Sequence, residues 1–142
     1  MRKRHFIAVL AATVVLGGCS WLFPKAKSEA PEVTVKNGKI SVEPEPLRFK
    51  VGGPPVDIVW QSDGKTRFAE NGIVIDGEVE RIGGPVINPK QDQIIECRAL
   101  EQGQKFTCKN LRSRKGLFKY TVRLIQDGKP LPPHDPGIMN ME

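Results

Sequence analysis

The residues of this sequence with the clearest chemical potential form a basic run in its carboxyl-terminal third. Between Gln102 and Gln126 the chain has no Asp or Glu. The same stretch carries seven cationic side chains: Lys105, Lys109, Arg112, Arg114, Lys115, Lys119 and Arg123. Such a concentration of positive charge predicts a basic patch that binds an anionic surface or an acidic protein. The alternative is that these side chains merely solvate the outer faces of strands, which is the commoner role of a charged run.

Residues that could hold a metal ion are few. A type 1 copper site needs two His and a free thiolate, with Met as a weak axial ligand. The sequence has two His, of which His5 lies in the amino-terminal region and His134 near the other end. Met139 and Met141 could join His134 around Cu(I), but three ligands on a tail are a weak signal. We predict no metal site and no other cofactor.

Groups suited to hydrolysis are equally scarce. The sequence has no Gly-x-Ser-x-Gly segment, and His134 stands among prolines, which is typical of a surface loop. Asp76, Glu78 and Glu80 fall on one face of an extended segment and could act as paired carboxylates of the glycosidase kind. A solvated strand face is the preferred interpretation, since Asp76-Gly77 is itself a turn signal. We therefore predict that the protein is not an enzyme.

The amino terminus combines three features of an export signal. Arg2, Lys3 and Arg4 precede an apolar stretch over residues 6–15, and Leu16-Gly17-Gly18-Cys19 follows. This order resembles a bacterial lipoprotein signal, in which a Leu or branched residue and two small residues precede an obligate Cys. The resemblance implies that residues 1–18 are removed and that Cys19 carries lipid. The alternative is an uncleaved membrane anchor over residues 6–23, which just reaches spanning length.

The same resemblance implies a location and a set of partners. Ser20 stands where inner-membrane lipoproteins of many Gram-negative bacteria carry Asp, so we expect an outer-membrane protein whose domain faces the periplasm. The lipid on Cys19 would make the membrane itself the first partner. For the basic run, anionic lipid, lipopolysaccharide or an acidic envelope protein are the expected partners.

Net charge argues against nucleic acid as a partner. The whole chain has a formal charge of +6. Without Arg2, Lys3 and Arg4 the mature chain has 19 basic and 16 acidic residues, a charge of +3. A charge this small does not provide the basic footprint of a nucleic-acid-binding domain.

If Cys19 is acylated, two cysteines remain, Cys97 and Cys108. An even pair in an oxidising compartment predicts a disulfide. Their numbers sum to 205, so a two-residue turn at Gln102-Gly103 would place them opposite each other in a hairpin. We expect both to face inward, under Trp60 or Phe118. The alternative is a pair of buried free thiols.

Alternating apolar residues dominate the rest of the chain and predict strands. Val33 and Val35, then Ile40 and Val42, flank Asn37-Gly38, a strong hairpin signal. The same alternation places Trp60, Phe118 and Tyr120 on the apolar faces of later strands, and we expect these three residues to form the core. Residues 24–32 lack any hydrophobic period and are typical of a linker.

No stretch after residue 23 has a sustained helical period, so the sequence predicts an all-β domain over residues 33–142, preceded by the lipidated Cys and linker over residues 19–32. We expect a small antiparallel β-sandwich of seven to eight strands. The ending, with Tyr120-Thr-Val122, Asp127-Gly128 and Asp135-Pro136, loosely resembles small immunoglobulin-like or cupredoxin-like envelope proteins.

Two functions fit these predictions. The first is a non-enzymatic outer-membrane lipoprotein that binds a partner or supports an assembly of the cell envelope. The second is a periplasmic module that binds a ligand or inhibits an enzyme. An exposed strand edge would favour the first function, and a concave apolar pocket with convergent polar groups would favour the second.

Overall fold

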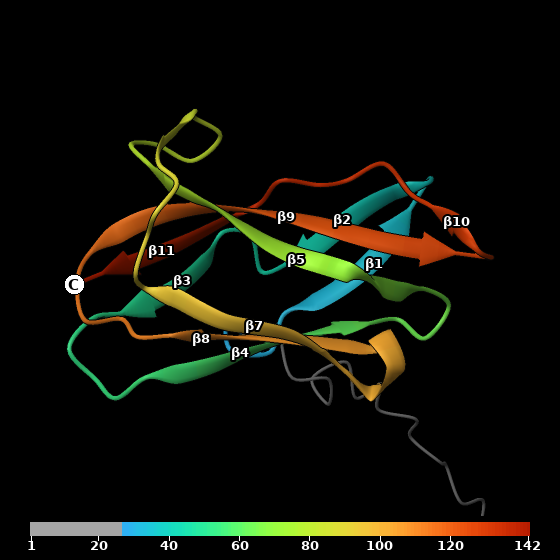
Figure 1. Cartoon of the computed structure of the whole chain (residues 1–142), viewed down its shortest axis with the longest axis horizontal. Coiled ribbons are helices and arrows are strands. Elements are labelled where there is room, and N and C mark those ends of the chain that lie inside the picture. Colours follow the sequence, from blue (N-terminus) through green and yellow to red (C-terminus); the bar gives the residue numbers. More distant parts are fainter. Residues whose placement is uncertain (1–26) are drawn as a thin grey trace, which may run out of the picture.

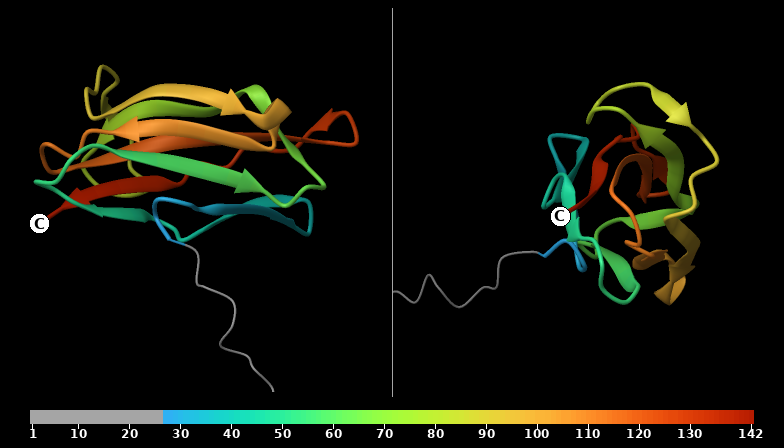
Figure 2. Two further views of the ribbon diagram at one scale, coloured as in Figure 1. Left: turned by 90° about the horizontal axis from the view of Figure 1, so that it is seen from below. Right: turned by 90° about the vertical axis from the view of Figure 1, so that its left-hand side faces the viewer.

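The computed structural model describes residues 27–142, which fold into two β-sheets packed face to face (Figures 1 and 2). The five-stranded sheet has the order β2-β1-β4-β8-β7. Its strands are β1 (Glu32–Lys36), β2 (Lys39–Glu43), β4 (Val56–Ser62), β7 (Ile94–Leu100) and β8 (Lys105–Asn110). The six-stranded sheet has the order β3-β11-β9-β5-β6, with β10 paired to β9. Its strands are β3 (Leu47–Lys50), β5 (Arg67–Val79), β6 (Val86–Asn88), β9 (Gly116–Gln126), β10 (Lys129–Pro130) and β11 (Gly137–Met141).

The all-β sandwich is confirmed, but its strand count and directions differ from the prediction. Residues 27–142 contain eleven strands. The sequence predicted fewer because β3, β6 and β10 have only four, three and two residues and leave little periodic signal. The pairs β1–β4 and β3–β11 are parallel, so both sheets are mixed rather than antiparallel. Alternation reports which face of a strand is buried, but it contains no information on the direction of the neighbouring strand.

Strand β5 corrects the turn expected at Asp76-Gly77. It continues through both residues to Val79, a length of 13 residues. Gly77 instead occupies a bulge with φ of 146°, and a Cβ there would lie 2.5 Å from the carbonyl oxygen of Asn88. A Gly in a strand can mark a close backbone approach as well as a turn.

The core joins the two sheets through the predicted aromatic residues. Trp60 on β4 and Tyr120 on β9 are fully buried, with ring centroids 5.3 Å apart. Trp60 Nε1 donates to the Tyr120 hydroxyl oxygen at 3.2 Å, which satisfies both buried polar atoms. Phe118 is also fully buried, so the predicted placement of these three residues in the core is confirmed.

The folded domain begins before Val33. The Arg48 N–H donates to Ser28 Oγ at 2.8 Å, and the Val59 N–H donates to the Glu29 carbonyl at 2.9 Å. These residues belong to the predicted linker, but they lie along β3 and β4. The segment has no hydrophobic period because hydrogen bonds to its backbone and to the Ser28 side chain, rather than apolar side chains, hold it in place.

The Cys97–Cys108 disulfide is present, with the two Cα atoms 4.1 Å apart. Leu100 pairs with Lys105, which is the expected register, but residues 101–104 form a four-residue turn with one 3-10 turn instead of a two-residue turn. Cys108 is fully buried, whereas Cys97 is exposed, so the expectation that both face inward is wrong for Cys97. The reason is its place on edge strand β7, where a bulge follows Ile95 and Glu96 adopts a φ of 53°.

Candidate functional site

The basic run does not form one continuous patch. Lys105 and Lys109 lie on β8 of the five-stranded sheet, whereas Lys119 and Arg123 lie on β9 of the six-stranded sheet. The outer faces of two stacked sheets point away from each other, so these two pairs cannot contact one flat partner together. Arg112, Arg114 and Lys115 lie in the loop, residues 111–115, that joins β8 to β9 at one end of the sandwich. The basic residues are therefore close in the sequence but lie on different faces of the domain.

Four lysines of the run have carboxylate partners. Lys105 Nζ lies 3.1 Å from Glu101, Lys109 Nζ lies 3.0 Å from Glu96, and Lys119 Nζ lies 3.2 Å from Asp135. Lys115 likewise contacts the Glu142 carboxylate. The hydrogen bond that Lys109 donates to Glu96, together with the negative charge of that carboxylate, raises the pKa of Lys109. These pairs are solvated and add little stability, but each places a negative charge beside the cation and so weakens the predicted patch.

The Arg112 side chain binds backbone carbonyls at the end of β3 and in the turn that follows it. Its Nε donates to the Pro54 carbonyl at 2.7 Å, and its Nη1 donates to the Lys50 carbonyl at 3.3 Å. The guanidinium covers Gly53 so closely that a Cβ there would lie 2.1 Å from Nη2. Arg112 therefore fastens the β8–β9 loop to the turn after β3.

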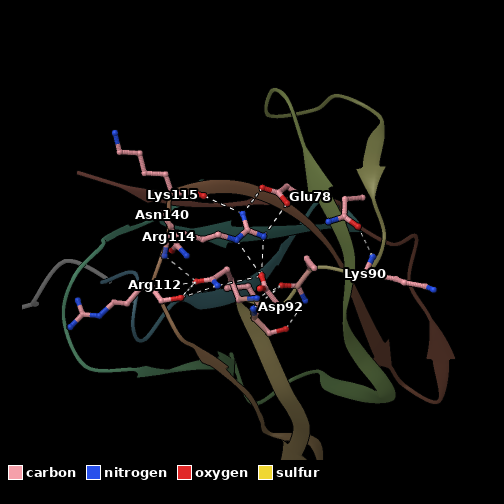
Figure 3. Close-up of polar contacts among 12 residues, drawn as sticks. Glu78, Lys90, Asp92, Arg112, Arg114, Lys115 and Asn140 are labelled. Carbon is pink, nitrogen blue, oxygen red and sulfur yellow. Dashed lines mark hydrogen bonds and ion pairs between the residues drawn. The ribbon is translucent and has the colours of Figure 1, made fainter.

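Arg114 lies between two carboxylates from different segments (Figure 3). Its Nη1 and Nη2 donate to the two oxygens of Glu78 at 2.8 and 3.2 Å, and Nη2 also donates to Asp92 at 2.9 Å. These bonds from the guanidinium lower the pKa of Glu78 and of Asp92 and raise the pKa of Arg114. Its guanidinium carbon also lies 6.0 Å from the centroid of the Phe118 ring. A bidentate Arg–carboxylate pair of this geometry orders the loop and leaves few donors for a partner.

The same loop is held by a buried amide. Gln93, 2% exposed, accepts hydrogen bonds from Ser113 N–H at 2.9 Å and Ser113 Oγ at 3.1 Å. Beside it, the buried side chains of Asn110 and Asn140 exchange two hydrogen bonds, at 2.8 and 3.0 Å, between the two sheets. The loop at this end is thus built for rigidity.

The sequence analysis did not identify Asp92 or Gln93, and it did not predict the ion pair of Glu78 with Arg114. The interpretation of Asp76, Glu78 and Glu80 as one solvated face is wrong for Glu78, whose side chain is 19% exposed. Its companion Asp76 accepts a hydrogen bond from Thr121 Oγ1 at 2.7 Å, while Glu80 is exposed. The irregularity between Ile75 and Gly77 places Glu78 opposite the buried Phe118, which simple alternation did not predict. Its partner Arg114 lies 36 residues away and left no local signal.

The ligands considered for Cu(I) are not brought together as a site. His134 Nε2 lies 2.9 Å from Glu45, and Met139 and Met141 lie on β11. Within residues 27–142, no three His, Cys, Asp or Glu side chains lie close enough to hold a metal ion.

The five-stranded sheet has two edges of different character. β7 carries a bulge and the charged side chains Glu96 and Arg98, which are devices that discourage a further strand. β2 pairs with β1 through five consecutive residues without a bulge, and among the described strands it pairs with no other. Because Lys36 and Lys39 close a two-residue turn, alternation directs the backbone N–H and C=O groups of Ile40 and Val42 away from β1.

No protein-family model and no curated protein matches this chain. Cys19 and the segment that resembles a lipoprotein signal lie outside the described residues. In the part that the structure describes, no helix is long and apolar enough to cross a membrane.

Proposed function

We propose that the chain is a non-enzymatic outer-membrane lipoprotein whose sandwich domain binds another protein of the cell envelope. The segment Leu16-Gly17-Gly18-Cys19 supports lipidation at Cys19. The Cys97–Cys108 disulfide supports an oxidising compartment such as the periplasm, because such bonds persist there and are rare in the cytosol. Ser28, the first residue with a contact to β3, lies nine positions after Cys19, so the domain stays within about 30 Å of the membrane.

The observation that carries the binding proposal is the regular free edge of β2. An extended segment of a partner can add to such an edge, where backbone hydrogen bonds provide affinity. On β2 the donors and acceptors of Ile40 and Val42 point outward while their side chains are buried in the core, at 6% and 2% exposure. The edge is therefore held rigidly in the conformation that a partner strand needs.

The test places a photo-crosslinking residue at position 41 in cells that produce the full chain. We expect one discrete crosslinked protein, which disappears when cells are challenged with an excess of the same chain without the crosslinker. In an otherwise native chain, Ser41→Lys should prevent association with that protein, because Lys on an edge opposes strand addition.

Thr34→Lys is the matched control. Thr34 lies opposite Ser41 on the same outer face and is similarly half-buried, but it belongs to the inner strand β1. It should leave the association unchanged. Equal loss in both variants would show a general charge effect and contradict recognition at the edge. For the anchor, Cys19→Ala should abolish labelling with a clickable fatty acid, and normal labelling would contradict the lipoprotein proposal.

A second function, a periplasmic ligand-binding module, is favoured by one specific observation. Arg123, which belongs to the basic run, lies in a groove lined mainly by apolar side chains on the six-stranded sheet.

A further inference from the structure

The outer face of the six-stranded sheet contains a groove of about 390 Å³. Its lining residues come from the end of β9 that lies next to β10 and from the segments beside it; Figure 1 shows the position of these two strands. This volume lies in the range of small-molecule sites, about 300–1,000 Å³. Arg123 and Ile125 come from β9, Ala69 and Asn71 from β5, and Pro130, Leu131 and Pro133 from the segment that follows β9. Of the described residues that line the groove, Arg123 alone carries a charge.

On one side of Arg123 the sheet opens through an irregularity in β5. Phe68 pairs with Leu124 and Ile73 pairs with Val122, so the four residues 69–72 of β5 lie opposite the single residue Arg123. An insertion of this size bends the strand away from its neighbour and leaves room beside the opposing side chain.

On the other side of β9, the backbone pairing with the segment after β10 is also interrupted opposite Arg123. After the turn at Asp127-Gly128, the chain returns along β9, and the Leu131 N–H donates to the Leu124 carbonyl at 3.0 Å. Pairing resumes at His134, whose N–H and C=O both bond to Val122. Between them lie Pro132 and Pro133, which have no N–H to donate. Both neighbours of β9 therefore interrupt their pairing opposite Arg123.

Arg123 itself is incompletely satisfied. Its Nη1 is buried, and it has no hydrogen-bond partner among the described residues. Arg114, from the same basic run, donates to two carboxylates. A buried donor of a cationic group strongly favours an acceptor, and an anionic oxygen is the best one.

We propose that this groove, named here the Arg123 groove, binds a small apolar carboxylic acid, with the carboxylate on the Arg123 guanidinium and the apolar body against Ile125, Pro130 and Leu131. Two carboxylate oxygens match one guanidinium fork. A phosphate monoester would bring nearly two charges and three oxygens, but the described lining offers one cation and the amide of Asn71. The largely apolar lining favours an apolar body over a sugar or a polar peptide.

The experiment measures octanoate binding by isothermal titration calorimetry to the full-length lipoprotein in phospholipid nanodiscs, with empty nanodiscs subtracted. Octan-1-ol, which has the same chain length and no charge, is the ligand control. We expect octanoate to bind at least about tenfold more tightly than octan-1-ol, and Arg123→Gln to abolish that preference. Arg123→Lys should retain part of it, because an ammonium keeps the charge without the planar fork.

Arg67→Gln is the matched protein control. Arg67 is an exposed cation on neighbouring β5, it pairs with Ile125, and it does not line the Arg123 groove. Its affinity for octanoate should stay within about twofold of the native value. Equal octanoate binding by the native chain and Arg123→Gln, or no preference of the native chain for octanoate over octan-1-ol, would overturn the proposal. Tighter binding of a peptide with an apolar carboxyl-terminal residue than of octanoate would also overturn it, in favour of a protein partner. None of these outcomes depends on recognition at β2, which is tested separately.

Discussion

Arg114 and Arg123 lie nine positions apart in the same acid-free stretch, yet their surroundings in the folded domain differ. Arg114 donates to both oxygens of Glu78 and to Asp92 and lies near the Phe118 ring. Arg123 has a buried Nη1 without a partner in the described chain and faces apolar neighbours. The first arginine is committed to the domain's own structure, and the second is available to something outside it.

The partners of each residue in a charged run therefore have to be identified before a function is assigned to the run. Arg114, Lys109 and Lys119 already form ion pairs with carboxylates of the domain, which leaves them less able to bind an external anion. Arg123, which is partly buried and forms no ion pair among the described residues, retains that capacity, and its surroundings leave less water to compete with an anion. Four predictions test this contrast between Arg114 and Arg123.

Arg114→Met should destabilise the domain by about 1–2 kcal/mol in urea unfolding, because it leaves the half-buried Glu78 carboxylate without its partner. The effect should fall below that of a fully buried pair, since the Arg114 side chain remains 40% exposed. The double variant Arg114→Met with Glu78→Leu should recover much of the loss. A single variant as stable as the native chain would remove the distinction between the two arginines.

The stability difference between the native chain and Arg114→Met should depend on pH. The pKa of Glu78 is lowered in the folded protein by the hydrogen bonds from Arg114, so its contribution is present above the unfolded pKa near 4.5 and is lost as pH falls through the folded value. Urea unfolding at pH 7 should show the full difference, and unfolding near pH 3 a smaller one. A difference that grows toward low pH would contradict the pairing.

Arg123→Met should have the opposite sign from the same substitution at position 114. Replacing a partnerless buried donor with a similar apolar chain should leave stability unchanged or raise it by about 1 kcal/mol, measured by urea unfolding without added ligand. With octanoate present, the native chain should regain the advantage, because a ligand that binds only the folded state stabilises it. A clear loss of stability in the absence of ligand would show that Arg123 has a structural role.

Lys119→Gln should change stability by less than about 0.5 kcal/mol, since its pair with Asp135 is largely solvated. It serves as the baseline for both arginines because it lies on β9, the same strand as Arg123. A loss as large as that of Arg114→Met would show that the outer face of β9 depends on charge pairing more than its exposure indicates.

The part of the fold that sequence analysis predicted is the part determined by neighbouring residues. Alternation placed Trp60, Phe118 and Tyr120 in the core, and Asn37-Gly38 closes the β1–β2 hairpin with φ angles of 53° and 73°. The Cys97–Cys108 pairing followed because a short hairpin sets its register by counting residues from the turn. The exposure of Cys97 did not follow, since it depends on a bulge at the sheet edge.

The candidate sites were less predictable for the same reason. The basic residues could be found by composition, but their partners could not: Glu78 and Arg114 are 36 residues apart, and Asn110 and Asn140 are 30 apart. The Arg123 groove required two interruptions, one in β5 and one at Pro132-Pro133, to fall opposite the same residue. The prolines were visible in the sequence, but their position beside Arg123 was not.

Local sequence patterns determined the all-β class, the β1–β2 hairpin, the apolar faces of β4 and β9, and the identity of the disulfide. These features follow from local backbone preferences and from a side-chain period of two. The tertiary structure alone decided which strands run parallel, which face carries each basic residue, and which arginine has a partner. Those outcomes depend on contacts between segments far apart in the chain, whose pairing is set by how the two sheets bury their apolar faces together.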